Sequence, residues 1–392
     1  AVAPDSVYID RAYDAAFTRS KGWTGADGAY SWPLPDGRVL WLFSDTLVGD
    51  VADGRRKLDA RLPASWGGVK MLNNSYAIQS SSDPESLKFP LTVEGGAFKN
   101  LFKPLTGGGA VWVNGVEEKD GRLTILLNQF VESDDPRFSI GRMAGLWAAT
   151  MEMNGDTLAV SDMRELRTPA VRPGVPGEKE AEIVWGAGTY SDATHTYMFN
   201  AVVSQADRSQ RKLLLSRAPR GEMDTPEAWE FHGPGGWNAD AQKAELIDVG
   251  MANEVSVHKL GDRLLLVSQT AFGEVQLHGA PRPEGPWTKP TTVYNTPELG
   301  GPGGQDITYH AKAHPHLSDS TGLLVGYNVN SLDIDRSLHE AAVYRPRFIR
   351  VPWSKVHAAQ EGLPETWTAR PGNGGAETTR LGEALSRLFS ER

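Results

Sequence analysis

Short β-rich runs, separated by Gly, Asn, Asp and Pro, recur along most of the 392-residue chain. This pattern limits the possible folds more than any other feature, because short runs bounded by turn-forming residues are typical of antiparallel strands. We therefore expect an all-β fold without long helices in the middle of the chain, and with short helices at 10–18 and 377–389. The clearest runs cover residues 123–130, 145–153, 182–190, 195–203, 212–219, 253–260, 263–269, 273–280, 322–330 and 341–353.

A repeated sequence pattern indicates how these strands are grouped. In segments 216–231, 278–290 and 344–355, a strand is followed by a Pro, a basic residue and then a Trp. Repeated supersecondary units favour the blades of a β-propeller over a sandwich. The alternative is that Pro–Trp turns recur by chance in a chain with 12 tryptophans.

Counting the first strand of each unit gives five candidate blades of differing length. They start near residues 27, 110, 183, 254 and 310. The sequence thus predicts a five-bladed β-propeller over 1–356, serving as the catalytic domain, and a C-terminal extension with a short helix over 357–392.

Charge and composition exclude several classes of function. The net charge of −9 repels phosphate backbones and anionic lipid, so we expect neither a nucleic-acid partner nor membrane insertion. No apolar run approaches the ~18 residues that a membrane span needs. The chain has no cysteine, which excludes disulfides, thiolate catalysis and Cys-ligated zinc. A neutral polymer such as a glycan stays possible as a partner.

The first residues, "AVA", are similar to the small-residue border left by signal-peptide removal. They predict a secreted or cell-envelope protein, although a shortened chain would begin in the same way. The sequence contains no GxSxG elbow, no P-loop and no HExxH motif. We expect no organic cofactor and no metal.

One hairpin carries two aspartates at matched positions. In "GADGAYSWPLPDGRVLWLFSDT" (25–46), the turn is centred on Asp36, with Asp27 nine residues before it and Asp45 nine residues after it. Residues equidistant from a hairpin turn sit opposite one another, with Cβ atoms ~4.5–5.5 Å apart. We therefore expect Asp27 and Asp45 side by side at the open end of the hairpin. Alternatively, each aspartate bonds its own backbone in a turn.

Several motifs resemble the bacterial domains of unknown function DUF4185 and DUF5005, in order along residues 22–353. They are the hairpin above, "NNSYAIQ" (73–79), "IVWGAGTY" (183–190), "PEGPWTKPTTVY" (283–294) and the closing "YNVNS…YRPRF" (327–348). The resemblance implies a five-bladed propeller. It also implies a glycoside hydrolase, since DUF4185 members include endo-D-arabinanases of glycoside hydrolase family 183, which cut the D-arabinan of mycobacterial cell walls.

Glycosidic hydrolysis gives the paired aspartates a role. One carboxylic acid protonates the leaving oxygen while another carboxylate activates water or attacks the sugar. Two neighbouring carboxylates cannot both ionise easily, so one of them retains a proton near neutral pH. We predict Asp27, Asp45 and a third carboxylate, Glu254 in "MANEVSV", as the catalytic group. A solvated strand-end glutamate is an equal alternative for Glu254, and Asp192 and Asp306 are further acidic candidates.

Aromatic and amide side chains are the candidates for holding the sugar. Aromatic rings stack on sugar faces, and amides offer a donor and an acceptor together. His310, His314 and His316 in "YHAKAHPHL" could bind hydroxyls or a cation, but Pro315 and the missing third ligand weaken the metal site. Buried structural roles are the alternative throughout. The predicted substrate-binding residues are Trp23, Asn74, Trp112, Trp185, His314 and Asn328.

We therefore expect a monomeric endo-acting hydrolase of furanosidic polymers, with D-arabinan, as in arabinogalactan and lipoarabinomannan, as its polysaccharide substrate. One alternative is a glycosidase for another furanose polymer, such as L-arabinan or galactofuranan. The other is a glycan-binding propeller without catalysis.

Overall fold

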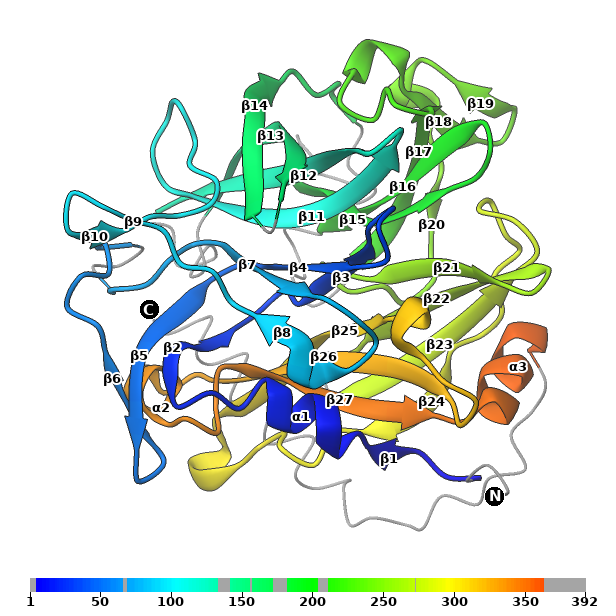
Figure 1. Cartoon of the computed structure of the whole chain (residues 1–392). Coiled ribbons are helices and arrows are strands. Elements are labelled where there is room, and N and C mark those ends of the chain that lie inside the picture. The colour runs from blue at the N-terminus through cyan, green and yellow to red at the C-terminus, as the bar shows by residue number, and fades with distance from the viewer. Residues whose placement is uncertain are drawn as a thin grey trace.

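The computed structural model describes residues 5–65, 69–132, 142–155, 157–171, 182–203, 211–271 and 273–362. Strands dominate, as Figure 1 shows, so the prediction of an all-β fold is confirmed. The helices are α1 (Arg11–Ala16), α2 (Ile334–His339) and α3 (Trp353–Glu361). Helix α1 is the one expected at 10–18, whereas the helix expected at 377–389 lies outside the described residues.

Five antiparallel sheets follow one another along the chain. The first pairs β3 (Tyr30–Pro33), β4 (Val39–Phe43), β7 (Ser75–Gln79) and β8 (Leu87–Lys88), and the second β11 (Ala110–Lys119), β12 (Arg122–Val131), β13 (Arg142–Asn154) and β14 (Thr157–Leu166). The third contains β15 (Glu182–Ser191), β16 (His195–Val203), β17 (Arg211–Pro219), β18 (Glu230–Gly233), β19 (Gly236–Asn238) and β20 (Leu246–Ile247). The fourth pairs β21 (Ser256–Leu260), β22 (Arg263–Gln269), β23 (Glu274–Ala280) and β24 (Thr291–Asn295).

The fifth sheet joins the two ends of the described chain. It pairs β25 (Asp306–Ala313), β26 (Leu323–Ser331) and β27 (Arg345–Val351), and β1 (Tyr8–Ile9) adds a fourth strand beside β27. Two smaller sheets lie outside this series. They are β2 (Lys21–Ala26) with β5 (Thr46–Ala52) and β6 (Arg55–Leu58), and β9 (Val93–Glu94) with β10 (Ala97–Phe98).

Each sheet packs on the next through an apolar cluster, and the fifth sheet packs on the first. Strand β4 shows how one sequence serves two neighbours. Leu40 and Leu42 face the second sheet, while Trp41 and Phe43 face the fifth. Alternate strand residues point to opposite faces, so a strand buried on both sides reads as the continuous apolar run VLWLF. That these sheets are five blades of one propeller stays a prediction.

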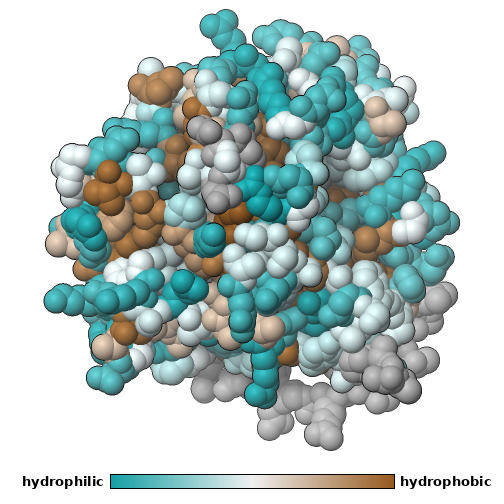
Figure 2. Space-filling view, in the orientation of Figure 1, coloured by the Kyte–Doolittle hydropathy of each residue, from teal (hydrophilic) through white to brown (hydrophobic). Residues whose placement is uncertain are grey.

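The first strands of the sheets converge closely. A Cβ atom added at Gly115 of β11 would lie 2.7 Å from Thr189 of β15, and one at Gly188 would lie 2.8 Å from Val255. Glycine, which has no Cβ atom, leaves room for these two neighbouring side chains. Hydrophilic residues cover most of the face in Figure 2, and no described helix is long and apolar enough to cross a membrane. The expected domain boundary at 356 falls within α3.

Candidate active site

The opening hairpin has the predicted register. Tyr30 pairs with Leu42 and Pro33 with Val39, around a turn in which Gly37 has a φ of 86°. The same register continues beyond β3, since the Asp27 N–H donates to the Asp45 carbonyl at 3.1 Å. Asp27 and Asp45 therefore lie opposite one another on the two arms.

The two aspartates do not end the ribbon, which corrects the expectation of an open end. Strands β2 and β5 continue the pairing, with Ala26 opposite Thr46. The pairing is bent beside Asp27, where Gly28 and Ala29 both have positive φ angles of 85° and 44°. The bend interrupts the regular ladder and leaves the acids between two strand segments.

Asp27 is half-buried and lies near two other carboxyl groups. Its Oδ2 atom accepts a hydrogen bond from the Tyr309 hydroxyl at 3.0 Å, while its Oδ1 atom is buried without a hydrogen-bond partner. Burial, followed by the charges of Asp45 and Glu254, raises the pKa of Asp27 well above its usual value. The geometry therefore favours a protonated Asp27.

Asp45 has a different set of neighbours. Its Oδ1 atom accepts hydrogen bonds from Asn73 Nδ2 at 3.2 Å and Trp112 Nε1 at 3.1 Å. Burial raises the pKa of Asp45 to about 6, against the opposing effect of these two donors. Donors that bond the charged form favour it, so Asp45 is held as a carboxylate at neutral pH.

Glu254, the third predicted carboxylate, precedes β21 and is 5% exposed. The Lys312 ammonium donates to its Oε2 atom at 2.5 Å, and His310 Nδ1 lies 3.4 Å from the same oxygen. Burial lowers the pKa of His310 to about 4, so this ring is neutral at neutral pH. The charge of Glu254 acts on Asp27, which places the three predicted acids in one cluster.

Tyr344 completes the cluster and was missed in the sequence analysis. It is buried, and burial together with the charges of Asp27 and Asp45 raises its pKa well above the usual value. Its φ of 59° is uncommon for a residue with a side chain, and the neighbouring Val343 carbonyl accepts from the buried Arg56 at 3.2 Å. Such outliers gather at functional sites.

A family model of the "Domain of unknown function (DUF5005)" matches residues 10–367. The chain belongs to the DUF5005 family. No curated protein matches the sequence. Among solved structures, the DUF5005 chain is similar to a protein of Bacteroides ovatus ATCC 8483 that is provisionally named a hydrolase. The identity is 21% and the TM-score 0.68, over 90% of this chain and 91% of that one.

A second structural relative is a levansucrase variant of Bacillus subtilis. Its identity is 10% and its TM-score 0.50, over 86% of each chain. At these identities the two likenesses show a shared fold and nothing about activity.

The DUF5005 chain places several predicted sugar-binding residues in its core. Trp23 is 1% exposed and stacks on Phe89 at 4.5 Å, and Trp185 packs on Trp229 at 5.3 Å, so neither indole has a free face for a sugar. Asn74 is fully buried, and its amide donates to the carbonyls of Phe102 and Val111. These three side chains support the fold and do not line the site.

Asn328 and His314 also differ from their predicted roles. The Asn328 amide donates to the Ala26 carbonyl at 3.1 Å, so it supports the strand that leads into Asp27. His314 is buried, and its Nδ1 atom is 2.6 Å from the Ser31 hydroxyl. Of the six predicted substrate-binding residues, Trp112 contacts a catalytic candidate, Asp45.

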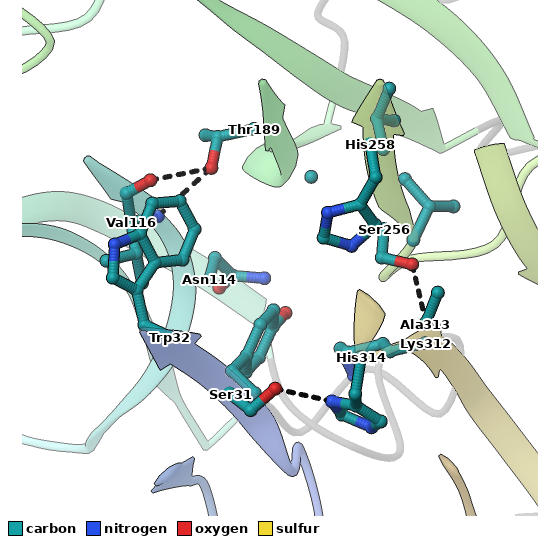
Figure 3. Close-up of a pocket in the computed structure, with 14 residues that line it drawn as sticks. Ser31, Trp32, Asn114, Val116, Thr189, Ser256, His258, Lys312, Ala313 and His314 are labelled. Carbon is teal, nitrogen blue, oxygen red and sulfur yellow. Dashed lines mark hydrogen bonds between the residues drawn. The ribbon is translucent and has the colours of Figure 1, made fainter. Parts of the chain in front are cut away.

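His314 belongs to a narrow cavity of about 40 Å³, drawn in Figure 3. Its walls come from β3, β11, β15, β21 and β25. Hydrogen bonds join the walls, from Thr189 to the Val116 carbonyl and from the Ala313 N–H to Ser256. Burial lowers the pKa of His258 and of His316, each to about 4. Within the described ranges, no three His, Asp or Glu side chains are placed to hold a metal.

The remaining acidic candidates, Asp306 and Asp192, form hydrogen bonds with other groups. Asp306 accepts two hydrogen bonds from Arg336, each of 2.8 Å. Asp192 accepts from the backbone N–H groups of Thr194 and His195, as a turn aspartate does.

A larger groove of about 580 Å³ lies beside Asp45. Asn73 lines this groove and donates to the Asp45 carboxylate, which connects the groove to the acidic cluster. Asn100, a second wall residue, accepts from the Asn73 N–H at 3.0 Å. The groove walls come from Pro63, Ala64, Ser65, Asn73, Ala97, Phe98, Lys99, Asn100, Lys103, Gly107, Gly109, Val131 and Glu132.

Proposed function

We propose that the chain is a glycoside hydrolase that cleaves furanosidic linkages in a polysaccharide, with D-arabinan as the first candidate. The observation that carries this proposal is the cross-strand pair Asp27 and Asp45, one carboxyl favouring its proton and the other held by two N–H donors. Glycosidic hydrolysis needs one protonated and one ionised carboxyl group on either side of the scissile bond.

The roles follow from the two environments. Asp27 gives its proton to the leaving oxygen as the glycosidic C–O bond breaks. Asp45 either takes a proton from the attacking water or bonds to the anomeric carbon before water displaces it. In both routes, the products are a new reducing end and a free hydroxyl group, and Asp27 recovers a proton. Glu254 carries the third charge and faces Asp27.

The fold supports this assignment. We propose that the five sheets are blades of one propeller and that the cavity of Figure 3 lies on its axis, since the first strand of every sheet lines that cavity. Lys312 contributes to the cavity wall and also bonds Glu254, so the acidic cluster adjoins one end of the axis.

The groove beside Asp45 supports a polymeric substrate. A volume of about 580 Å³ lies within the range of ligand sites of roughly 300–1,000 Å³ and suits several sugar units. Its wall carries amides and hydroxyls, such as Asn100 and Ser65, that can hydrogen-bond sugar hydroxyls. We further propose that the protein acts as a monomer outside the cytoplasm or at the cell envelope, where such polymers occur.

Incubation with D-arabinan, L-arabinan and galactofuranan, followed by measurement of new reducing ends and released oligosaccharides, tests the proposal. Cleavage of D-arabinan to oligosaccharides of several lengths is the expected result. Cleavage of only another polymer would replace the substrate and keep the reaction. Saturable binding without new reducing ends would instead indicate a glycan-binding protein and would remove the catalytic roles of Asp27 and Asp45.

A further inference from the structure

Lys312 is a buried cation whose three N–H groups all have acceptors. It is 3% exposed, and its Nζ atom donates to Glu254 Oε2 at 2.5 Å, to the Gly28 carbonyl at 2.6 Å and to the His310 carbonyl at 3.4 Å. The Tyr30 ring lies 4.2 Å from the same nitrogen. An ammonium group has three donors and no acceptor, so these neighbours match its charged form.

A local irregularity of β25 brings Lys312 to the acids. Tyr309 and Lys312 are three residues apart, and in a regular strand they would point to opposite faces. The register against β26 shifts between these two residues, and His310 has a φ of 59°. As a result, the side chain of Tyr309 reaches Asp27 while that of Lys312 reaches Glu254.

Lys312 also joins three separate parts of the chain. Gly28 directly follows Asp27, Glu254 lies in the segment before β21, and Lys312 belongs to β25. Its two shortest bonds therefore fix the Glu254 carboxylate relative to the backbone that carries Asp27. Without the ammonium group, Glu254 would be a buried charge without a cation, which is costly.

The charges around Asp27 do not balance. The groups around it are Asp45 between β4 and β5, Glu254, Lys312 and Tyr309 from β25, and Tyr344 before β27. His310 is neutral near pH 7 and adds no second cation. Three carboxyl groups thus share one ammonium group, and a bound proton relieves the excess negative charge.

We propose that Lys312 is a positioning residue, which fixes the Glu254 carboxylate next to Asp27 so that the proton of the cluster stays on Asp27. This inference rests on the proposed function for its catalytic meaning, although the placement of the proton can be measured without a substrate.

The experiment replaces Lys312 by methionine, which has a similar length and no charge. Glu254 then loses the cation that holds its carboxylate beside Asp27, so the charge that raises the pKa of Asp27 is no longer fixed there. We expect this loss to outweigh the smaller effect of the Lys312 ammonium group, which lowers the pKa of Asp27. We expect kcat/KM to fall about tenfold or more. In the pH profile of kcat/KM, the alkaline limb, where Asp27 loses its proton, should move to lower pH. Lys259→Met, at an exposed lysine of β21, is the matched control and should leave both unchanged.

Two further variants separate positioning from a general loss of structure. Glu254→Gln removes the same charge while keeping Lys312, so its alkaline limb should also move to lower pH. The double variant Lys312→Met/Glu254→Gln should have the same alkaline limb as Lys312→Met, since the Glu254 carboxylate is no longer fixed beside Asp27 there. A lower rate in Lys312→Met with the alkaline limb at its original pH would overturn the proposal. So would a double variant in which the two single-variant shifts of the limb add together.

A carboxyl ¹³C NMR titration of Asp27 in the full chain provides the readout that needs no substrate. We expect its midpoint at a lower pH in Lys312→Met and in Glu254→Gln than in the unaltered protein. If Lys312→Met does not fold, Glu254→Gln alone decides the matter, because an unmoved Asp27 midpoint there contradicts the inference. Absence of polysaccharide cleavage would overturn the proposed function but not this result.

Discussion

The acidic cluster and the buried asparagines of the neighbouring sheets show two uses of polar groups in one interior. Asn128 of β12 donates to Asn114 and to the Trp185 carbonyl and accepts from the Trp185 N–H, so its amide is fully used. Asn200 of β16 is similarly bonded to Gly186 and Leu214. In contrast, Asp27 keeps a buried oxygen without a partner. These two asparagines hold the fold with every amide atom bonded, whereas Asp27 retains a buried oxygen with unused bonding capacity.

Of the changes that test this contrast, replacing Asp27 by Asn should have the largest effect, and the effect should be on kcat. The amide cannot donate a proton to the leaving oxygen, so kcat should fall by about 10²–10⁴-fold, as for a lost general acid. The measurement is initial-rate kinetics on the polymer that the unaltered protein cleaves. Asp36→Asn, at the exposed turn of the same hairpin, is the control and should retain full activity. Wild-type rates in Asp27→Asn would exclude Asp27 from the mechanism.

The pH dependence of stability should distinguish the acids from the amides next. The pKa of Asp45 is about 6 in the folded chain against 3.8 for an ordinary aspartate, so the folded state binds this proton more tightly. Stability should therefore decrease by ~1–3 kcal/mol as pH rises from about 4 to about 6 and stay lower above that. Thermal unfolding of the unaltered chain and of Asp45→Asn measures this.

Asp45→Asn removes that titration, so the variant should unfold at a higher temperature than the unaltered protein at pH 8. The difference should disappear below about pH 3, where Asp45 is protonated in both the folded and the unfolded state. A variant that is less stable at pH 8 would show that the ionised carboxylate, with its Asn73 and Trp112 donors, stabilises the fold.

Asn128→Ala should give the opposite result to the acid variants. It leaves the Trp185 backbone groups and Asn114 without their partner, which costs about 1–3 kcal/mol of unfolding free energy for buried polar groups. Chemical denaturation measures this cost, and activity per folded molecule should not change. A large loss of kcat in folded Asn128→Ala would show that Asn128 also contributes to activity, and would contradict this difference between the asparagines and the acids.

The smallest effect is expected in the groove. Lys99 and Lys103 line it and are exposed, so they can donate to sugar hydroxyls away from the reacting bond. Replacing both by Ala should raise KM about fivefold, from ~1 kcal/mol of lost hydrogen bonding, with kcat unchanged. Lys88→Ala, on β8, is the control. An unchanged KM would place the polymer outside this groove.

The sequence predicted what depends on local, regular geometry. The register of Asp27 against Asp45 followed from their equal distance to the turn, and the first strand of each sheet lies close to its predicted start. Trp23, Trp185 and Asn74 were assigned to the substrate because residue type alone does not tell which side of a packed strand faces solvent. Glu254 joined the cluster, as expected, from a distant part of the chain.

Lys312 and Tyr344 were missed for a physical reason. Each reaches the acids because the backbone departs from regular strand geometry, by a register shift in β25 and by a positive φ at Tyr344. Neither departure occurs at a glycine, so no sequence signal marks it. The position of His314 in the cavity likewise depends on how strands from five sheets converge, which the pattern within one strand does not specify.

The pairing of β1 with β27 has a consequence for biosynthesis. Arg350 donates to Asp10 across 340 residues of chain, and Asp27 depends on Tyr309 across 282. A nascent polypeptide leaving the ribosome would carry Asp10 and Asp27 long before Arg350 and Tyr309 are translated. Closure of β1 on β27, and of β25 on the segment that carries Asp27, is thus the step that assembles the acidic cluster, and such distant contacts form slowly. A chain translated only as far as β24 should therefore lack the assembled acidic cluster, because Tyr309 and Lys312 belong to β25.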